Sequence, residues 1–133
     1  MPTPESNKRV VRNYVQALGD RDYDHAEQLS DRRWTEHVPG APPAGLERLR
    51  AGERWFAAFS DWEPTIVEQI AEGDTVFTRV RWSGRHTGEF IGVPATGADA
   101  SFEVFRLDRV ADGKLVETRY MYDLQGFLDT LRR

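Results

Sequence analysis

Three ionisable residues, His37, His86 and Asp123, stand near the predicted ends of secondary-structure elements and have apolar neighbours. An imidazole with an ordinary pKa of about 6.5 can act as an acid, a base or a hydrogen-bond donor near neutral pH. A carboxylate shielded from water by aromatic neighbours becomes a stronger base, because burial disfavours its charged form. If the three side chains converge in an apolar pocket, they can remove a proton next to a carbonyl and stabilise the oxyanion that forms.

Each of these residues also has a purely structural interpretation. Asp123 stands where a strand gives way to a helix, which is the position of an N-cap. Arg119 is on the same predicted strand face, and an ion pair with it would lower the pKa of Asp123. His86 can fill the end of its strand, and His37 can lie at the surface. The residues alone leave both interpretations open.

The segment GRHTGEFIGVPATG, residues 84–97, places His86 at a strand end and then turns the chain with glycines and a proline. Its residues Phe90, Ile91 and Val93 are too apolar for an ordinary exposed turn. We expect residues 89–97 either to close over a pocket as a lid or to pack as permanent core.

Large side chains along the sequence can line such a pocket and bind a hydrophobic small molecule. The candidate substrate-binding residues are Tyr14, Trp34, Trp55, Phe59, Trp82, Phe90, Arg119 and Met121.

Composition limits the other functions. The 133 residues predict one domain, residues 1–133. Eighteen basic and 22 acidic residues give a net charge of −4, and residues of both signs are interspersed along the chain. This pattern argues against a nucleic-acid partner or an anionic membrane surface. Without cysteine, a helical zinc motif or a phosphate loop, the sequence predicts no metal and no cofactor. No apolar run approaches the roughly 20 residues of a membrane span, and we expect a soluble cytoplasmic protein.

Periodicity predicts helices first and then strands. An apolar stripe predicts a helix over residues 6–18, followed by a short helix at 24–29, an extended segment at 33–38 and a third helix from Leu46 to Phe59. Strands follow at 65–71, 75–87, 100–110 and 115–122, and a short helix ends the chain. This order predicts an α+β fold in which a curved antiparallel sheet wraps around the N-terminal helices and encloses a pocket. Phe77, Arg79 and Arg81 share the face opposite His86, and we expect this outer face to form a homodimer interface.

Several motifs together resemble those of a known family. They are the early helix with Tyr14, His37-Val38-Pro39-Gly40, residues 84–97, the turn at Asp112-Gly113-Lys114, and Asp123 before a leucine-rich terminal helix. In this order they are similar to a SnoaL-like polyketide cyclase domain of the nuclear transport factor 2-like superfamily. The resemblance implies a cone-shaped fold that is commonly dimeric through its sheet.

The resemblance also implies roles for particular residues. Asp123 matches an aspartate that serves as the base of an intramolecular aldol closure without metal or cofactor. His86 matches the histidine of the glycine-loop motif, and His37 matches a polar pocket position. The expected function is a cofactor-independent, acid/base ring closure on a hydrophobic oxygenated small molecule of secondary metabolism. The alternatives are an epoxide-opening hydrolase or cyclase, a ketosteroid-isomerase-like enzyme, and a non-catalytic small-molecule-binding domain of the same fold.

Overall fold

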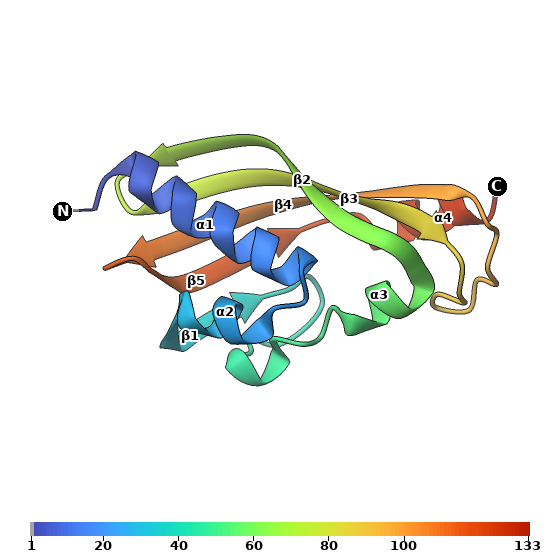
Figure 1. Ribbon diagram of the computed structural model, residues 1–133, viewed down its shortest axis with the longest axis horizontal. Helices are drawn as coiled ribbons and strands as arrows, with labels where there is room; N and C mark the ends of the chain where they lie inside the picture. The colour runs from blue at the N-terminus through green and yellow to red at the C-terminus, as the bar shows by residue number, and fades with distance from the viewer. Residues whose placement is uncertain (1) are drawn as a thin grey trace.

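A five-stranded sheet organises the fold, and the computed structural model, which describes residues 2–133, shows helices packed along it (Figure 1). The strands are β1 (Ser30–His37), β2 (Phe59–Glu72), β3 (Thr75–His86), β4 (Asp99–Ala111) and β5 (Lys114–Met121). Their order in the sheet is β1-β5-β4-β3-β2. The predicted α+β fold is confirmed.

The sheet is mixed and open, whereas the sequence predicted an antiparallel one. β2, β3, β4 and β5 pair antiparallel along the chain, but β1 pairs parallel with β5. Tight turns join β2 to β3 and β4 to β5, which makes these pairs antiparallel, and the longer loop of residues 87–98 returns the chain from β3 to the antiparallel β4. β1 joins from far along the sequence, so no short turn dictates its direction.

Helix α1 (Pro4–Gly19) confirms the first predicted helix and extends it at both ends. Thr3 and Ser6 form a capping box, in which the Ser6 backbone N–H donates to Thr3 Oγ1 at 3.0 Å. The buried side chains of α1 include Val11, Tyr14 and Val15. Figure 1 shows α1 lying along the sheet with α2 (Tyr23–Gln28) beside its C-terminal end.

The third predicted helix is broken into two short pieces, the 3-10 helix η1 (Leu46–Arg48) and α3 (Glu53–Ala58). Gly52 stands at the start of α3, and Phe59 already belongs to β2, where it pairs with His86. Pro64 lies within β2 and does not end a helix. Because β2 is an edge strand, the missing N–H of proline is tolerated there.

The buried side chains form two clusters at opposite ends of the sheet. One packs beneath α1 and contains Tyr14 and Val80. The other contains Trp62 and Phe102, together with side chains of the terminal helix α4 (Leu124–Leu131). Members of both clusters border the same cavity, which therefore lies between them.

Candidate active site

A cavity of about 310 Å³ opens between the inner face of the sheet, α1 and the η1–α3 segment. This volume is at the small end of the range for ligand pockets, roughly 300 to 1,000 Å³. Its lining is mostly apolar and aromatic, with a few polar groups. The lining residues named below are Tyr14, Tyr23, Glu36, Arg48, Arg54, Trp55, Trp62, Trp82, Phe102, Arg106, Tyr120 and Tyr122.

Arg106, on β4, is the buried cation of this cavity. Its residue is only 3% exposed, and its Nε and Nη2 donate to the two oxygens of Asp108 at 2.8 and 2.9 Å. Burial disfavours the charge of the guanidinium, but the charge and hydrogen bonds of Asp108 together with the two phenols of Tyr120 and Tyr14 outweigh this effect, so the pKa of Arg106 is raised. Nη1 is the one guanidinium nitrogen with no hydrogen-bond partner within residues 2–133. The guanidinium is thus fixed in position with one donor group left over.

A hydrogen-bond chain behind the cavity wall holds Asp108. The Thr118 hydroxyl donates to Asp108 Oδ1, and the Trp34 indole Nε1 donates to Thr118 Oγ1 at 3.0 Å. Asp108 and Thr118 are at most 1% exposed. Buried polar groups that are fully paired in this way hold a unique geometry.

Two tyrosine rings flank the Arg106 guanidinium. Its carbon lies 4.9 Å from the ring centre of Tyr14 and 5.2 Å from that of Tyr120. Burial raises the pKa of both phenols. Both hydroxyls therefore stay protonated at neutral pH and can donate hydrogen bonds to a substrate oxygen.

Glu36, on β1, is the acidic residue in the lining. It is 8% exposed, and its backbone is held by bonds to both Ala44 and the neighbouring β5. Burial raises the pKa of its carboxyl group, although the charges of Arg48 and Arg106 act in the opposite direction. No ion pair or side-chain hydrogen bond to Glu36 occurs within residues 2–133. A carboxylate in this state is a strengthened base that borders open space.

Trp55 lies at the centre of the aromatic wall. Its ring centre is 4.6 Å from that of Phe102, 5.5 Å from that of Trp62 and 4.4 Å from that of Phe90. These contacts hold Trp55 as a flat apolar surface against which a planar ligand can pack.

Of the predicted binding residues, only Tyr14, Trp55 and Trp82 line the cavity. Trp34, Phe59 and Phe90 are buried outside its lining, where they complete the core. Arg119 and Met121 are exposed on the opposite face of β5, with Met121 65% exposed. The structure therefore places these five residues outside the lining of this cavity.

The three predicted catalytic residues do not converge at the cavity. Asp123 is exposed and caps α4, accepting the Gly126 backbone N–H at 2.8 Å. His86 is fully buried beside Phe59, and its Nδ1 lies 3.1 Å from Thr96 Oγ1. His37 is half-buried, with Nε2 3.3 Å from Glu117 Oε2 but without hydrogen-bond geometry. None of the three is among the lining residues.

The polar residues found at the cavity, where the three predicted catalytic residues are absent, carried a signal in the sequence. Arg106 and Asp108 occupy alternate positions of β4 in register with Phe102, Val104 and Val110, so two charges stand on an apolar face. On β5 it is Thr118 and Tyr120 that face inward, whereas Glu117 and Arg119 form an ion pair on the outside. Assigning the wrong face of β5 to the pocket hid Tyr120 and selected Arg119 instead.

The apolar residues of segment 89–97 pack mainly as core, which was one of the two expectations for this segment. Phe90 and Val93 are 2% and 4% exposed and belong to the aromatic cluster, while Ile91 is 44% exposed. Residues 48–56 of the η1–α3 segment cover the cavity instead.

Comparisons with known proteins agree with this fold and cavity. The family model for SnoaL-like polyketide cyclases matches residues 8–131. The chain is 33% identical over 132 residues to the aklanonic acid methyl ester cyclase DnrD of Streptomyces peucetius, covering 95% of this chain and 86% of that one. It is 32% identical over 99 residues to the nogalonic acid methyl ester cyclase of Streptomyces nogalater, covering 67% and 74%.

Solved structures give the same assignment. IdmH of Streptomyces antibioticus, a proposed polyketide cyclase, superposes with a TM-score of 0.88 at 26% identity, covering 96% of this chain and 99% of that one. An α+β fold with a largely apolar cavity between its sheet and helices suits a protein that binds or converts a small molecule. Among such proteins, the chain belongs to the SnoaL-like polyketide cyclase family. The family resemblance and the predicted class of enzyme are confirmed.

Two further findings concern the described part of the chain. Within residues 2–133 no three histidine, aspartate or glutamate side chains gather as a metal-binding group. No helix there has the length and apolar character needed to cross a membrane.

Proposed function

We propose that this protein closes a ring in a hydrophobic polyketide-like molecule by intramolecular aldol addition, without a cofactor, and that Glu36 is the base. The observation that carries the proposal is an unpaired carboxylate of raised pKa that shares an apolar cavity with a fixed guanidinium. A general base works best when its pKa is brought toward the working pH.

The reaction proceeds in three steps that conserve all atoms of the substrate. Glu36 removes a proton from a carbon next to a carbonyl, leaving an enolate. Arg106 and the hydroxyls of Tyr14 and Tyr120 stabilise the negative oxygen. The enolate carbon then attacks a second carbonyl of the same molecule, and the new alkoxide takes the proton back from Glu36.

The aromatic wall supports a planar apolar substrate. Trp55 and Phe102 stack on each other in the cavity lining, and apolar lining of this kind excludes water from the reacting carbon. The relatives are named for methyl esters of aklanonic and nogalonic acid, which makes aklanonic acid methyl ester a reasonable test substrate.

Conversion of aklanonic acid methyl ester by Glu36→Gln tests the base. We expect kcat to fall by about 10²- to 10⁴-fold, because glutamine keeps the shape but cannot accept the proton. The matched control is Asp123→Asn, which alters a carboxylate outside the cavity and should leave kcat unchanged. If Asp123→Asn abolishes turnover and Glu36→Gln does not, the base is Asp123. If the wild type binds the ester and releases it unchanged, the protein is a binding domain.

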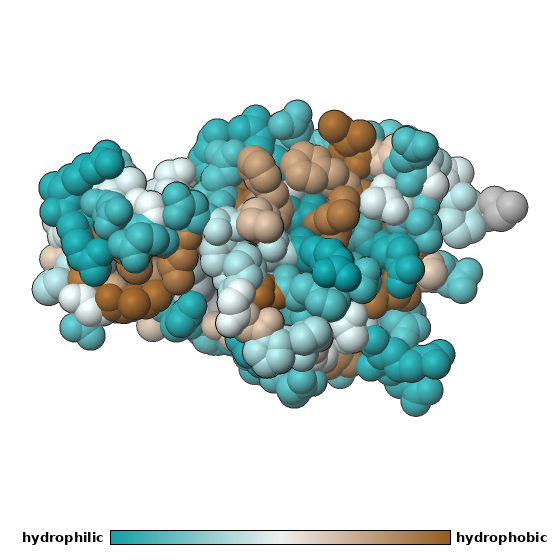
Figure 2. All heavy atoms as spheres, turned by 180° about the vertical axis from the view of Figure 1, so that it is seen from behind, coloured by the Kyte–Doolittle hydropathy of each residue, from teal (hydrophilic) through white to brown (hydrophobic). Residues whose placement is uncertain are grey.

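We also propose that the outer face of the sheet forms a homodimer interface. Exposed apolar side chains gather there: Ile70 is 61%, Phe105 43%, Leu107 44% and Met121 65% exposed. They occupy neighbouring positions on β2, β4 and β5, and Figure 2 shows brown and tan spheres gathered over this face. Apolar patches of this kind mark interaction surfaces when polar residues surround them.

Light scattering of the purified protein tests the dimer. We expect a mass of about twice 15.3 kDa for the wild type and a monomer for the double variant Phe105→Lys, Leu107→Lys. Ile91→Lys is the control, since Ile91 is equally exposed but lies on the β3–β4 loop. A monomeric wild type at micromolar concentration would refute the interface. The expected cytoplasmic location stays a prediction.

A further inference from the structure

Glu36 and Arg106, the proposed base and the buried cation of the cavity, stand on strands that β5 separates. Glu36 on β1 pairs with Thr118 on β5, and Thr118 pairs on its other side with Asp108 on β4. Asp108 in turn holds the guanidinium of Arg106, two residues away on the same strand. The position of Glu36 relative to Arg106 is therefore set by how β1 and β4 are aligned on β5.

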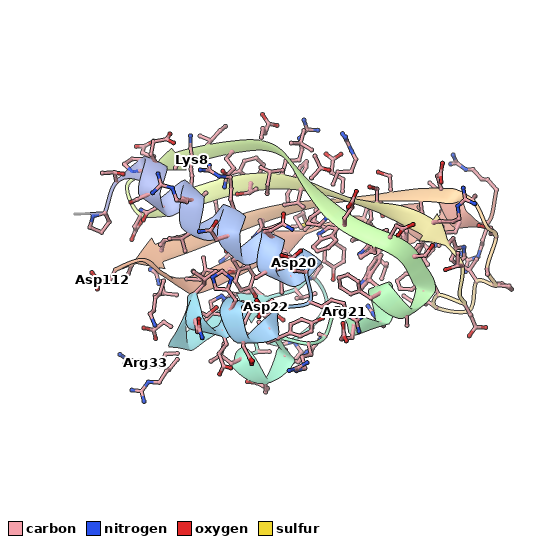
Figure 3. All side chains as sticks on the ribbon, in the orientation of Figure 1. Lys8, Asp20, Arg21, Asp22, Arg33 and Asp112 are labelled. Atoms are coloured by element: carbon pink, nitrogen blue, oxygen red, sulfur yellow. The ribbon has the colours of Figure 1, made fainter. Side chains whose placement is uncertain are left out.

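A two-residue turn aligns β4 with β5, but no turn aligns β1 with it. Between Ser30 and Thr35, β1 advances five residues while β5 advances only two, so residues 31–34 form an irregular stretch. Within it the backbone N–H of Arg33 donates to the Asp31 side chain at 2.8 Å, and the Arg33 side chain extends away from the body of the molecule (Figure 3). The regular pairing that resumes at Thr35 therefore needs another contact to fix its register.

The Trp34 side chain supplies such a contact at the end of the irregular stretch. Its indole Nε1 donates to Thr118 Oγ1 at 3.0 Å, and both residues are at most 1% exposed. Because an indole N–H can only donate, the Thr118 hydroxyl accepts from Trp34 and directs its own proton to Asp108. The Trp34 ring also packs against Tyr14, with ring centres 6.2 Å apart, and Tyr14 flanks the Arg106 guanidinium. One buried side chain thus contacts two of the groups that surround the cation.

We propose that Trp34 and Thr118 are positioning residues of the ring closure, whose hydrogen bond aligns β1 on β5 and thereby places Glu36 relative to Arg106. They act through these two groups, since neither is among the residues that line the cavity. The proposal rests on the function proposed above, in which Glu36 removes the proton and Arg106 stabilises the oxyanion. A misplacement of about 1 Å in such a pair can lower the rate about 10²-fold, although the aromatic wall still binds the substrate.

Kinetics of Thr118→Val and Trp34→Phe with aklanonic acid methyl ester test the proposal. Valine keeps the shape of threonine without its hydroxyl, and phenylalanine removes the indole N–H but keeps an aromatic ring. We expect each variant to lower kcat about 10- to 100-fold per folded molecule, with KM within about twofold of the wild type. Thr118→Ser keeps the hydroxyl and should restore kcat. A loss that serine does not restore would overturn the role of the hydroxyl.

The double variant shows whether the two side chains act through their shared bond. If they do, Trp34→Phe combined with Thr118→Val loses little more kcat than Thr118→Val alone, because the bond is already absent. Losses that multiply would overturn the proposal. Ser30→Ala is the matched control, since it removes a buried hydroxyl of β1 that donates to the Ala26 carbonyl at 2.9 Å. This control should lose stability and keep the kcat of the wild type.

Amide hydrogen exchange gives a second readout that does not depend on turnover. We expect Thr118→Val to exchange faster at residues 34–37 of β1 and at the wild-type rate at residues 76–80 of β3. Unchanged exchange at residues 34–37 would overturn the alignment of β1 by this bond, even if the wild type converts no ester.

Glu36→Gln in the same assay separates this proposal from the proposed function. If Glu36→Gln loses turnover and Thr118→Val keeps it, Glu36 stands as the base and the positioning role is overturned. If both lose turnover and serine at position 118 restores it, both proposals are supported. If Glu36→Gln keeps full turnover, the base assignment fails, and the positioning role that rests on it fails as well.

Discussion

The two ends of the sheet both hold polar groups among aromatic rings, but only one has room for a ligand. At the far end, His86 is fully buried beside Phe59, and the rings of Phe90 and Phe127 close the space around them. Near α1, Arg106 and Glu36 border a cavity of about 310 Å³. An ionisable group with apolar neighbours is therefore a weak indication of a site unless unfilled space lies next to it.

The two ends also differ in how their polar groups are paired. Arg106 is held by a chain that runs through Asp108 and Thr118 to Trp34. His86 contacts Thr96 through Nδ1, but its Nε2 is buried without a partner. The paired end can hold a charge in a fixed position, whereas the other end contributes mainly packing.

The largest expected effect comes from breaking the buried pair on β4. Asp108→Asn should destabilise the protein by about 3 to 5 kcal/mol, because it leaves the Arg106 charge buried and uncompensated. Urea unfolding followed by tryptophan fluorescence measures the change. Asp99→Asn is the control on the same strand, since its contact with Arg85 is 3.9 Å long and its side chain is 93% exposed. Equal losses in the two variants would contradict the special role of the buried pair.

A smaller effect is expected at the other end of the sheet. Asp123→Ala removes the cap of α4 and should cost about 1 kcal/mol of stability, with turnover per folded molecule unchanged. Thermal unfolding and the ring-closure assay on one sample separate the two readouts. A normal melting curve combined with lost turnover would show that Asp123 takes part in the reaction.

The sequence predicted the fold better than the site, and β3 and β5 show why. On β3 the alternation that set Phe77, Arg79 and Arg81 opposite His86 identified the two faces correctly, because Val76, Thr78 and Val80 on the side of His86 are buried. On β5 both faces carry large side chains, and the sequence prediction selected Arg119 and Met121, which lie on the face opposite to Tyr120. Only the pairing of β5 with β4 and β1 decides which of the two faces lies toward the helices.

Glu36 was hidden for a different reason. It lies two residues after the buried Trp34 on β1, but a strand with one inward glutamate has no distinctive pattern of its own. The burial of Glu36 depends on the η1–α3 segment, which the sequence predicted as one continuous helix. The break at Gly52 turns residues 48–56 over the cavity, and this tertiary arrangement creates the site.

The smallest effect concerns the pH dependence of stability, and it distinguishes Glu36 from a structural carboxylate. Burial raises the pKa of Glu36 in the folded state, so its favourable contribution is present below the ordinary pKa and is lost as the pH rises through the raised one. Glu36→Gln should therefore unfold at higher urea than the wild type near pH 7 and match it near pH 4. Glu53 gives the opposite sign, because hydrogen bonds from Arg21 and Tyr23 lower its pKa.

Glu53→Gln should accordingly be less stable than the wild type near pH 7, with a difference that shrinks as the pH falls through the lowered pKa of Glu53. Urea midpoints from about pH 2 to pH 8 measure the pH dependence of both Glu→Gln variants. A carboxylate whose removal stabilises the fold while turnover falls is one that the protein keeps for its reaction. If both variants lose stability near pH 7, Glu36 is an ordinary structural residue. Its carboxylate then stabilises the fold in the same way as that of Glu53, although it borders the cavity.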